Sequence, residues 1–421
     1  MAFKLYLLFV ISFFLHLPAR VPILGLVRFD VLLVALIGAL VIAKKESRTD
    51  SSVTDTDKAL RVLLAYCLVT VPLVEWPGSV LWKGFPDLVK ATIFYFFTVS
   101  IISTEARLRT YMWVFLVCQS LRILEPLYLN VSDGYWGSAT FVQYEEMMDR
   151  LSGAPSDTIN PNGLAFVIVS VIPFMHYLTL SAGWRYKLIY FLLLPLFIYT
   201  LVLTASRSGL LGLGAILIGI FLKSQRKFLL IAVAGIGALI VVANLSDLQK
   251  ERYLSIGRDD VRFAGTAHGR TEGMVSNLEV VWNRPIFGHG LGTSLEANFH
   301  ATGQAKPAHN LYLEILQETG IIGLVIFLFF MKSIIVNFKV SLDAIRTRVT
   351  EHSYLANITT AMQVWLLMNI LFSFASYGLT SYEWYLFGGL SVVIRRLVEA
   401  ERSSAVPEED VRWGREFAFS R

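Results

Sequence analysis

The chain has 421 residues, of which 55% are hydrophobic and only 16% are charged, and its mean hydropathy is +0.58. Soluble domains contain about 25% charged residues, so this composition excludes a water-soluble globular protein. The formal net charge of +5 does not indicate a nucleic-acid partner, because basic residues in membrane proteins set the orientation of the helices. Both cysteines, Cys67 and Cys118, lie in apolar runs, which argues against disulfides and against a cysteine-ligated metal.

Apolar runs long enough to approach a membrane span recur along the whole chain. The N-terminal stretch "MAFKLYLLFVISFFLHLPAR" lacks a small-x-small cleavage site, which indicates an uncleaved first span. Backbone in lipid must satisfy its own hydrogen bonds, so the runs are expected to be helices. About twelve spans are predicted, at residues 4–17, 23–43, 59–75, 89–104, 109–127, 162–180, 187–204, 208–223, 228–244, 316–337, 355–376 and 382–397.

Lysine and arginine in the short connections predict which side each connection faces. The segments "AKKESRTD", "EARLR", "WRYK", "KSQRK", "FKVSLDAIRTR" and "IRRLVEAER" are basic and fall on alternate connections. The positive-inside rule then places these segments and both termini in the cytoplasm. The remaining connections face outward, including residues 128–161, the tight turn at "TASRSG" and the long segment 245–315.

The expected fold is therefore an all-α polytopic membrane protein in four parts. Residues 1–244 form an N-terminal bundle of about nine helices, and residues 245–315 form a large outer loop. Residues 316–398 supply about three further helices, and residues 399–421 form a polar cytoplasmic tail. The outer loop is expected to contain an amphipathic helix, because Met274, Leu278, Val281 and Trp282 recur at helical spacing.

Three residues of the outer face are candidates for chemistry, and each also has an ordinary explanation. Arg207 lies between two apolar runs with almost no loop, where an arginine faces a wet cavity or anchors the helix at the headgroups. Arg270 has Glu272 as a neighbour, so a surface ion pair explains it equally well. His309 precedes a span, and a single histidine there is more often structural. The glycines of "PIFGHGLGTS" indicate a turn, because no strand and no P-loop lysine accompany them.

Taken together, these segments match a known family. "ASRSGLLGLG", "GRTEGMVSNLEVVWNRPIFGHGLG" and "AHNLYLEILQETGIIGLVIFL" resemble, in order and spacing, the signature of the O-antigen ligase and polymerase superfamily. The helix start "NPNGLA" is similar to that of the family too, and a capping Asn160 followed by Pro161 accounts for it. The resemblance covers roughly residues 160–330. That superfamily includes lipopolysaccharide O-antigen ligases, exopolysaccharide polymerases and protein O-oligosaccharyltransferases.

The resemblance implies a bacterial inner-membrane glycosyltransferase of GT-C type with its active site on the periplasmic face. The donor would be a glycan on undecaprenyl pyrophosphate, and the acceptor would be lipid A-core, a lipid-linked glycan or a protein. The expected catalytic residues are Arg207, Arg270 and His309. The arginines would bind the pyrophosphate, and His309 would act as general base. The family implies an inverting reaction without metal, ATP or other cofactor.

Further polar residues are assigned lesser roles. Asn310 and Glu314 adjoin His309, and Glu314 is a candidate to orient its imidazole or to bind substrate. Arg258 and Arg284 lie in the outer loop as candidate substrate-binding residues. A solvated loop surface explains both arginines as well, and His268 and His289 compete with His309 for the role of base.

The main alternative is a membrane transporter or flippase for a polar or lipid-linked substrate. Charged residues within or beside the predicted spans, such as Arg28, Asp30 and Glu75, would suit a transporter. Against that reading, the sequence has no evident internal repeat and no matching pair of broken helices in its two halves. Ligase and polymerase activities remain equally open, as do the sugar and the oligomeric state.

Overall fold

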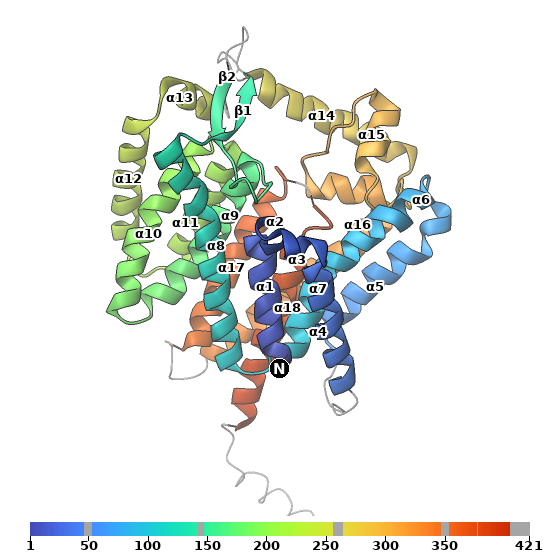
Figure 1. The fold of residues 1–421 in the computed structure, drawn as a ribbon, viewed down its shortest axis with the longest axis horizontal. Helices are drawn as coiled ribbons and strands as arrows, with labels where there is room; N and C mark the ends of the chain where they lie inside the picture. The colour runs from blue at the N-terminus through green and yellow to red at the C-terminus, as the bar shows by residue number, and fades with distance from the viewer. Residues whose placement is uncertain (46–52, 142–146, 256–263, 347–352, 377, 405–421) are drawn as a thin grey trace, which may run out of the picture.

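The computed structural model describes residues 1–45, 53–141, 147–255, 264–346, 353–376 and 378–404. For a few of these residues, including 264–272, only the backbone is described. Long helices lie side by side in one bundle (Figure 1), and a helix overlaps each predicted span. Five described helices, α8, α9, α10, α16 and α17, are long and apolar enough to cross a membrane. The protein is a helical, multi-pass membrane protein, and the number of its crossings stays a prediction.

The elements of the N-terminal half are α1 (Ala2–Leu15), α2 (Leu17–Arg20), α3 (Pro22–Leu26), α4 (Phe29–Lys45), α5 (Asp55–Val69), a 3-10 turn (Val71–Leu73), α6 (Pro77–Ser79), a π-helical turn (Val80–Gly84), α7 (Phe85–Ile101), α8 (Glu105–Asp133), β1 (Gly137–Phe141), β2 (Met147–Leu151), α9 (Pro161–Leu180) and α10 (Trp184–Leu203). Those of the C-terminal half are α11 (Arg207–Lys223), α12 (Lys227–Asn244), α13 (Asp247–Leu254), α14 (Ala264–Asn283), α15 (Ser294–Thr302), α16 (Leu311–Arg346), α17 (Tyr354–Phe372) and α18 (Tyr382–Ser404).

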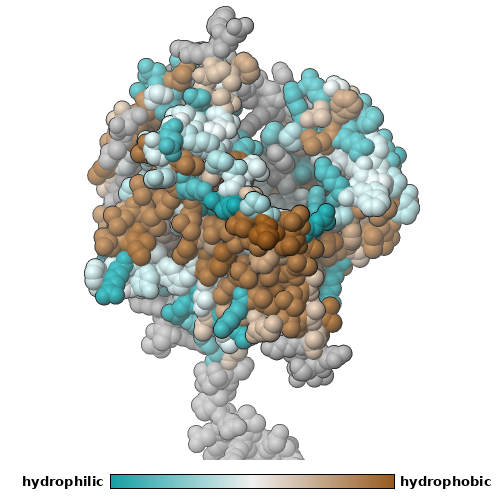
Figure 2. Space-filling view, viewed as in Figure 1, coloured by the Kyte–Doolittle hydropathy of each residue, from teal (hydrophilic) through white to brown (hydrophobic). Residues whose placement is uncertain are grey.

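Apolar side chains fill the bundle and also cover its outside. Trp365 and Phe387 are buried where α17 meets α18, with their rings 3.7 Å apart between centroids. In contrast, Trp184 and Phe228 are 71% and 89% exposed on α10 and α12. Figure 2 shows a hydrophobic band across the middle of the molecule with hydrophilic residues above it. Such a belt fits a protein whose solvent is lipid.

The elements that connect the helices gather at one end of the bundle. Figure 1 shows the β1–β2 hairpin, α13, α14 and α15 at the end opposite the N-terminus. The hairpin is antiparallel, with Gly137 opposite Leu151. The sequence predicted α14 as an amphipathic helix, and the helix is confirmed. The hairpin was not foreseen, but the described chain is otherwise helical, in agreement with the expected all-α membrane protein.

The segment before α9 is fixed by a buried ion pair. Arg122 of α8 donates from Nε and Nη2 to the two carboxylate oxygens of Asp157, at 2.7 and 3.2 Å, and both side chains are buried. Two donors aligned with two acceptors restrict the geometry of both groups. The pair holds residues 152–160 against the bundle, so Asn160 begins α9 at a defined place. Its Oδ1 accepts from the backbone N–H of Gly163 at 2.9 Å, which confirms the predicted capped start.

Helix α16 is broken at Gly320, and the glycine-rich turn docks into the break. Gly320 has φ +66° and ψ −171°, so the helix changes direction there. The backbone N–H groups of His289 and Gly290 donate to the carbonyls of Gln317 and Glu318, at 2.8 and 3.0 Å. Backbone groups released by the break thus gain partners, as buried polar groups require. The turn predicted for the glycines of "PIFGHGLGTS" is thereby confirmed.

Replacing Gly320 with alanine should destabilise the protein. A Cβ at this position would lie 2.1 Å from the carbonyl oxygen of Ile286, in a backbone conformation that disfavours side chains. The expected cost is at least ~1–3 kcal/mol of the free energy of unfolding. The loss of stability is measured as a fall in the temperature above which the purified protein no longer elutes as a monodisperse chromatography peak. Gly214→Ala is the control, because nothing lies within 4 Å of a Cβ there. Equal temperatures for the two variants would contradict the argument.

Candidate active site

Arginines gather around the turn between α10 and α11. Arg150, at the end of β2, donates from Nε to the carbonyl of Thr204 at 2.9 Å. Arg252 of α13 donates from Nε to the carbonyl of Ala205 at 2.8 Å. Both side chains are buried. Carbonyls at the end of a helix lack partners within that helix, so guanidinium groups stabilise the turn while bringing positive charge to it.

Arg207 completes this group, which we call the arginine cluster: Arg150, Arg207 and Arg252. Arg207 is the first residue of α11 and is 8% exposed. Its Nη1 donates to Oγ of Ser255 at 2.8 Å, and that hydroxyl donates to the carbonyl of Arg252 at 2.7 Å. Every acceptor named here is uncharged, and these bonds orient the guanidinium groups.

The neighbouring Tyr253 is consistent with a dry and positively charged setting. Burial raises the pKa of Tyr253 to about 12, and the charges of Arg150 and Arg252 oppose part of that rise. Electrostatic interactions are stronger in such an environment than in water. Tyr253 therefore lies in a buried region to which Arg150 and Arg252 bring positive charge.

Asn162, in the first turn of α9, joins the arginine cluster to a cavity. Its Oδ1 accepts from Nη2 of Arg150 and from Oγ of Ser206, both at 2.9 Å. The same side chain lines a cavity of about 320 Å³, which we call cavity 1. The starts of α9, α16 and α18 meet there through Asn160, Leu311 and Glu383. Helix N-termini carry partial positive charge, so this wall favours an anion.

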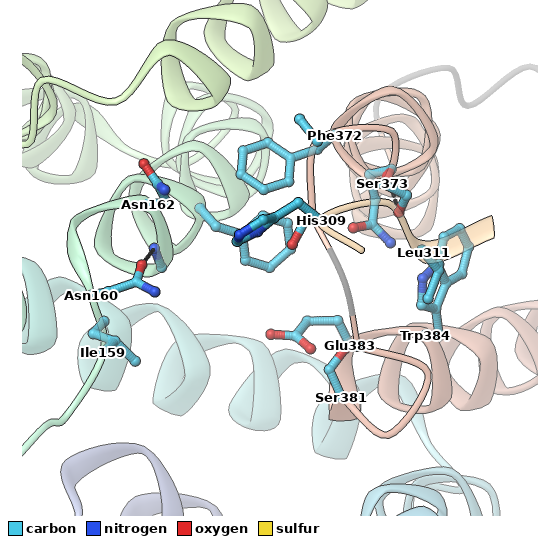
Figure 3. A pocket seen from close by; sticks show the side chains of 16 residues that line it. Ile159, Asn160, Asn162, His309, Leu311, Phe372, Ser373, Ser381, Glu383 and Trp384 are labelled. Carbon is cyan, nitrogen blue, oxygen red and sulfur yellow. Dashed lines mark hydrogen bonds between the residues drawn. The ribbon is translucent and has the colours of Figure 1, made fainter. Parts of the chain in front are cut away.

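His309 projects into the same cavity. Figure 3 shows its ring directed towards Asn160 and Asn162. The residue has φ +50°, a left-handed conformation that is uncommon outside glycine and that aims the side chain before α16 begins. His309 also lines a second cavity of about 380 Å³, which we call cavity 2. The histidine therefore lies between two cavities.

Asn310 and Glu314, which follow His309 in the chain, hydrogen-bond to nearby backbone groups. Asn310 Oδ1 accepts from the backbone N–H groups of Tyr312 and Leu313, at 3.0 and 3.1 Å, so this residue caps α16. Glu314 Oε2 accepts from the backbone N–H groups of Gly378 and Leu379, at 2.6 and 3.2 Å. The carboxylate thus binds the loop that leads to α18, and its bonds do not support the expectation that it orients the imidazole. The substrate-binding roles of Asn310 and Glu314 stay predictions.

Glu383 is a further acid in cavity 1 that the sequence analysis did not single out. Its carboxyl group points into the cavity (Figure 3), and Oε2 is buried without a hydrogen-bond partner among the described residues. A buried acceptor without a partner calls for an explanation, such as a ligand that completes it. The carboxyl group is placed to accept a hydrogen bond from a hydroxyl of a bound molecule.

Arg284 and His289 are engaged away from the cavities at His309. His289 faces Glu75 Oε2 through Nδ1 at 2.6 Å and the carbonyl of Val280 through Nε2 at 2.9 Å. Arg284 Nε lies 3.4 Å from the same Glu75 oxygen. Because both histidine nitrogens are occupied, His289 is unsuited to be the base. The structure also does not bring Arg284 to the proposed site, since its partner fixes it elsewhere.

Other predicted residues fall outside the structural description. Arg270 and His268 lie on α14, and their side chains are not among those described. Arg258 lies in 256–263, outside the described residues. Their roles stay predictions. Within the described part of the chain, no group of three or more His, Cys, Asp or Glu side chains is arranged to hold a metal ion.

A comparison with known protein families matches a region that contains several of the residues described above. A family model described as O-Antigen ligase matches residues 190–328. This part of the chain is similar to the O-antigen ligase family. The resemblance to the O-antigen ligase and polymerase superfamily is thereby confirmed, and Arg207, Arg270 and His309 all lie inside the matched region. A comparison with curated proteins finds no match. Arg150, Asn162 and Glu383 lie outside the matched region.

Proposed function

We propose that this O-antigen ligase-type protein transfers a glycan from a lipid pyrophosphate, undecaprenyl pyrophosphate, to an acceptor hydroxyl at the periplasmic face of the inner membrane. The observation that carries the proposal is the meeting of His309 with Asn162 in cavity 1, since Asn162 binds the arginine cluster directly. A general base and an anion-binding wall then adjoin a single space. A GT-C-like architecture is part of the same proposal.

The leaving group sets the first chemical requirement. When the bond between the anomeric carbon and the phosphate oxygen breaks, negative charge grows on the pyrophosphate. Arg150 is hydrogen-bonded to Asn162, and Arg207 belongs to the same arginine cluster, so both bring positive charge to this region; the start of α9 adds its N–H groups. Groups held in place before the reaction stabilise such charge with little reorganisation. Arg270 is proposed as a further ligand of the pyrophosphate.

The acceptor sets the second requirement. Its hydroxyl oxygen forms the new bond to the anomeric carbon, and His309 accepts the proton that this hydroxyl loses. The electron pair of the broken bond leaves with the pyrophosphate, so one displacement inverts the anomeric centre. The carboxyl group of Glu383 accepts a hydrogen bond from a hydroxyl of the donor sugar. This bond holds the sugar ring between His309 and the leaving group.

The transporter alternative loses much of its motivation. Glu75 pairs with His289 and Arg284, and Asp30 accepts a hydrogen bond from Ser12, so both acids have local structural roles. Charges that hold a fold together do not call for a transported substrate.

The test is a transfer reaction with the purified full-length protein in nanodiscs. A native mixture of undecaprenyl-pyrophosphate glycans and acceptor is supplied without ATP, and the released lipid pyrophosphate is measured with and without EDTA. We expect release at equal rates in both conditions. One large product would indicate a ligase, and a ladder of products a polymerase. No release from substrates that a known transferase consumes would overturn the proposal, and loss of release in EDTA would overturn its metal-independence.

A further inference from the structure

Two side chains of cavity 1 have buried polar atoms without a hydrogen-bond partner. Asn369, in the last turn of α17, lines the cavity and is 4% exposed. Its Nδ2 has no partner among the described residues, and the same holds for Oε2 of Glu383. Buried polar groups in folded proteins are nearly always paired. One donor and one acceptor, supplied by different helices, are thus left over in a single cavity.

Backbone contacts fix Asn369 relative to His309. The backbone N–H and the Oγ hydroxyl of Ser373 both donate to the carbonyl of Asn369, at 3.0 and 2.7 Å. The carbonyl of Ser373 accepts from the backbone N–H of Leu311 at 2.9 Å, which ties the end of α17 to the start of α16. His309 lies just before Leu311 in the chain. The amide of Asn369 and the proposed base are therefore held in one framework.

Apolar side chains share cavity 1 with these two polar groups. Phe166 and Phe372 line it with their ring centroids 4.8 Å apart, and Trp384 lines it as well. Ligand sites commonly combine apolar walls with a few polar groups that fix the orientation of the ligand. A sugar ring, with apolar carbon–hydrogen faces and polar hydroxyls, matches this combination.

The unpaired donor and acceptor favour one class of ligand group. The carboxylate of Glu383 accepts a hydrogen bond, and the amide N–H of Asn369 donates one. A hydroxyl serves both, since it has one O–H and two lone pairs. An ionised carboxylate has no hydrogen to donate to Glu383, and an ammonium group has no lone pair for Asn369. A hydroxyl therefore suits the two side chains better than either charged group.

We infer that Asn369 donates a hydrogen bond to a hydroxyl of the donor sugar and determines which donor sugars bind. The inference rests on the proposed function, which puts the donor in cavity 1, and it adds a residue outside the matched region. Asn369 and Glu383 then hold the sugar from two helices, α17 and α18. A sugar without this hydroxyl leaves the buried amide unpaired and binds more weakly.

Two substitutions remove the amide, and a third is the matched control. Asn369→Leu keeps a side chain of similar volume in an apolar helix, and Asn369→Ala removes the amide without adding bulk. Asn357→Leu makes the same exchange at a half-buried position of α17 that does not line cavity 1. The two asparagines are separated by ~18 Å along the helix. A monodisperse chromatography peak shows that each variant is folded.

Binding is measured by calorimetry on the full-length protein in nanodiscs, without acceptor. The probes are the farnesyl pyrophosphate derivatives of glucose and galactose, and analogues in which each hydroxyl in turn is replaced by hydrogen. For the wild type we expect one analogue to bind about tenfold more weakly than its parent. Both Asn369 variants should bind the parent about tenfold more weakly and should no longer distinguish it from that analogue. Asn357→Leu should keep the wild-type pattern.

The outcomes separate this contact from a role in the fold and from the proposed function. If the Asn369 variants weaken every probe by the same factor, Asn369 only supports the fold, and the inference is overturned. Unchanged affinities in these variants, or a wild type that binds no probe or ignores every hydroxyl, overturn it too, even if lipid pyrophosphate is released in the transfer reaction. A hydroxyl-specific loss in a protein that transfers no glycan would keep the contact and reject the transferase.

Discussion

Replacing His309 with asparagine is expected to lower kcat by about 10²–10⁴-fold while leaving the fold and the donor KM nearly unchanged. Asparagine tolerates the left-handed backbone that His309 adopts at φ +50°, whereas alanine would add strain. The variant keeps a polar side chain at the junction of the two cavities but lacks a group that accepts a proton near neutral pH. The measurement is the initial rate of lipid pyrophosphate release at saturating donor and acceptor.

His300→Asn is the matched control for this experiment. His300 is exposed on α15, stacks on Trp76 with ring centroids 5.3 Å apart, and does not line either cavity. Its replacement should leave the rate unchanged. If His309→Asn turns over like the wild type, His309 is not the base, and another group must take the proton.

Hydropathy and capping predicted the helices well because lipid leaves the backbone few choices. A run of apolar residues in a membrane must satisfy its N–H and C=O groups internally, so span and helix coincide. The start of α9 followed from local chemistry alone, since Asn160 caps it as expected. The outer-face location of Arg207 and His309 was inferred from basic residues in the other connections, and it stays a prediction.

The arginine cluster escaped the sequence analysis because its members come from three separate elements. Arg150 ends a hairpin strand and Arg252 lies on a short helix, and only the fold brings them to the turn at Thr204. One signal was present. Arg150 and Arg252 both fall in connections predicted to face outward, where the positive-inside rule leads us to expect few arginines.

The break at Gly320 is likewise a tertiary property. In the sequence, Gly320 is a glycine beside an apolar run, which favours close helix packing. The break is stabilised by a turn some 30 residues earlier, whose N–H groups donate to the carbonyls of Gln317 and Glu318. Local propensity carries no information about a partner so distant in the chain. The same limit applies to Glu383, whose place in cavity 1 depends on the packing of α18.

Arg207→Lys is expected to lower kcat/KM for the lipid-linked donor by about 10²-fold. Lysine preserves the charge but not the planar fork that binds two oxygens at once. Loss of two charge-assisted hydrogen bonds, at ~1.5 kcal/mol each, corresponds to that factor. The side chain also loses its bond to Ser255, so the orientation of the cationic group within the arginine cluster is no longer fixed. The rate of pyrophosphate release as a function of donor concentration gives the ratio.

Arg185→Lys supplies the control, since Arg185 is exposed at the beginning of α10, a 20-residue helix whose far end leads to the turn before Arg207. That length corresponds to ~30 Å, so this substitution leaves the site untouched. A point charge alone would suffice if Arg207 only supplied attraction, and Arg207→Lys would then match Arg185→Lys. A large loss with lysine instead means that the pyrophosphate is held by geometry as well as by charge, as a site that aligns a leaving group opposite an attacking hydroxyl requires.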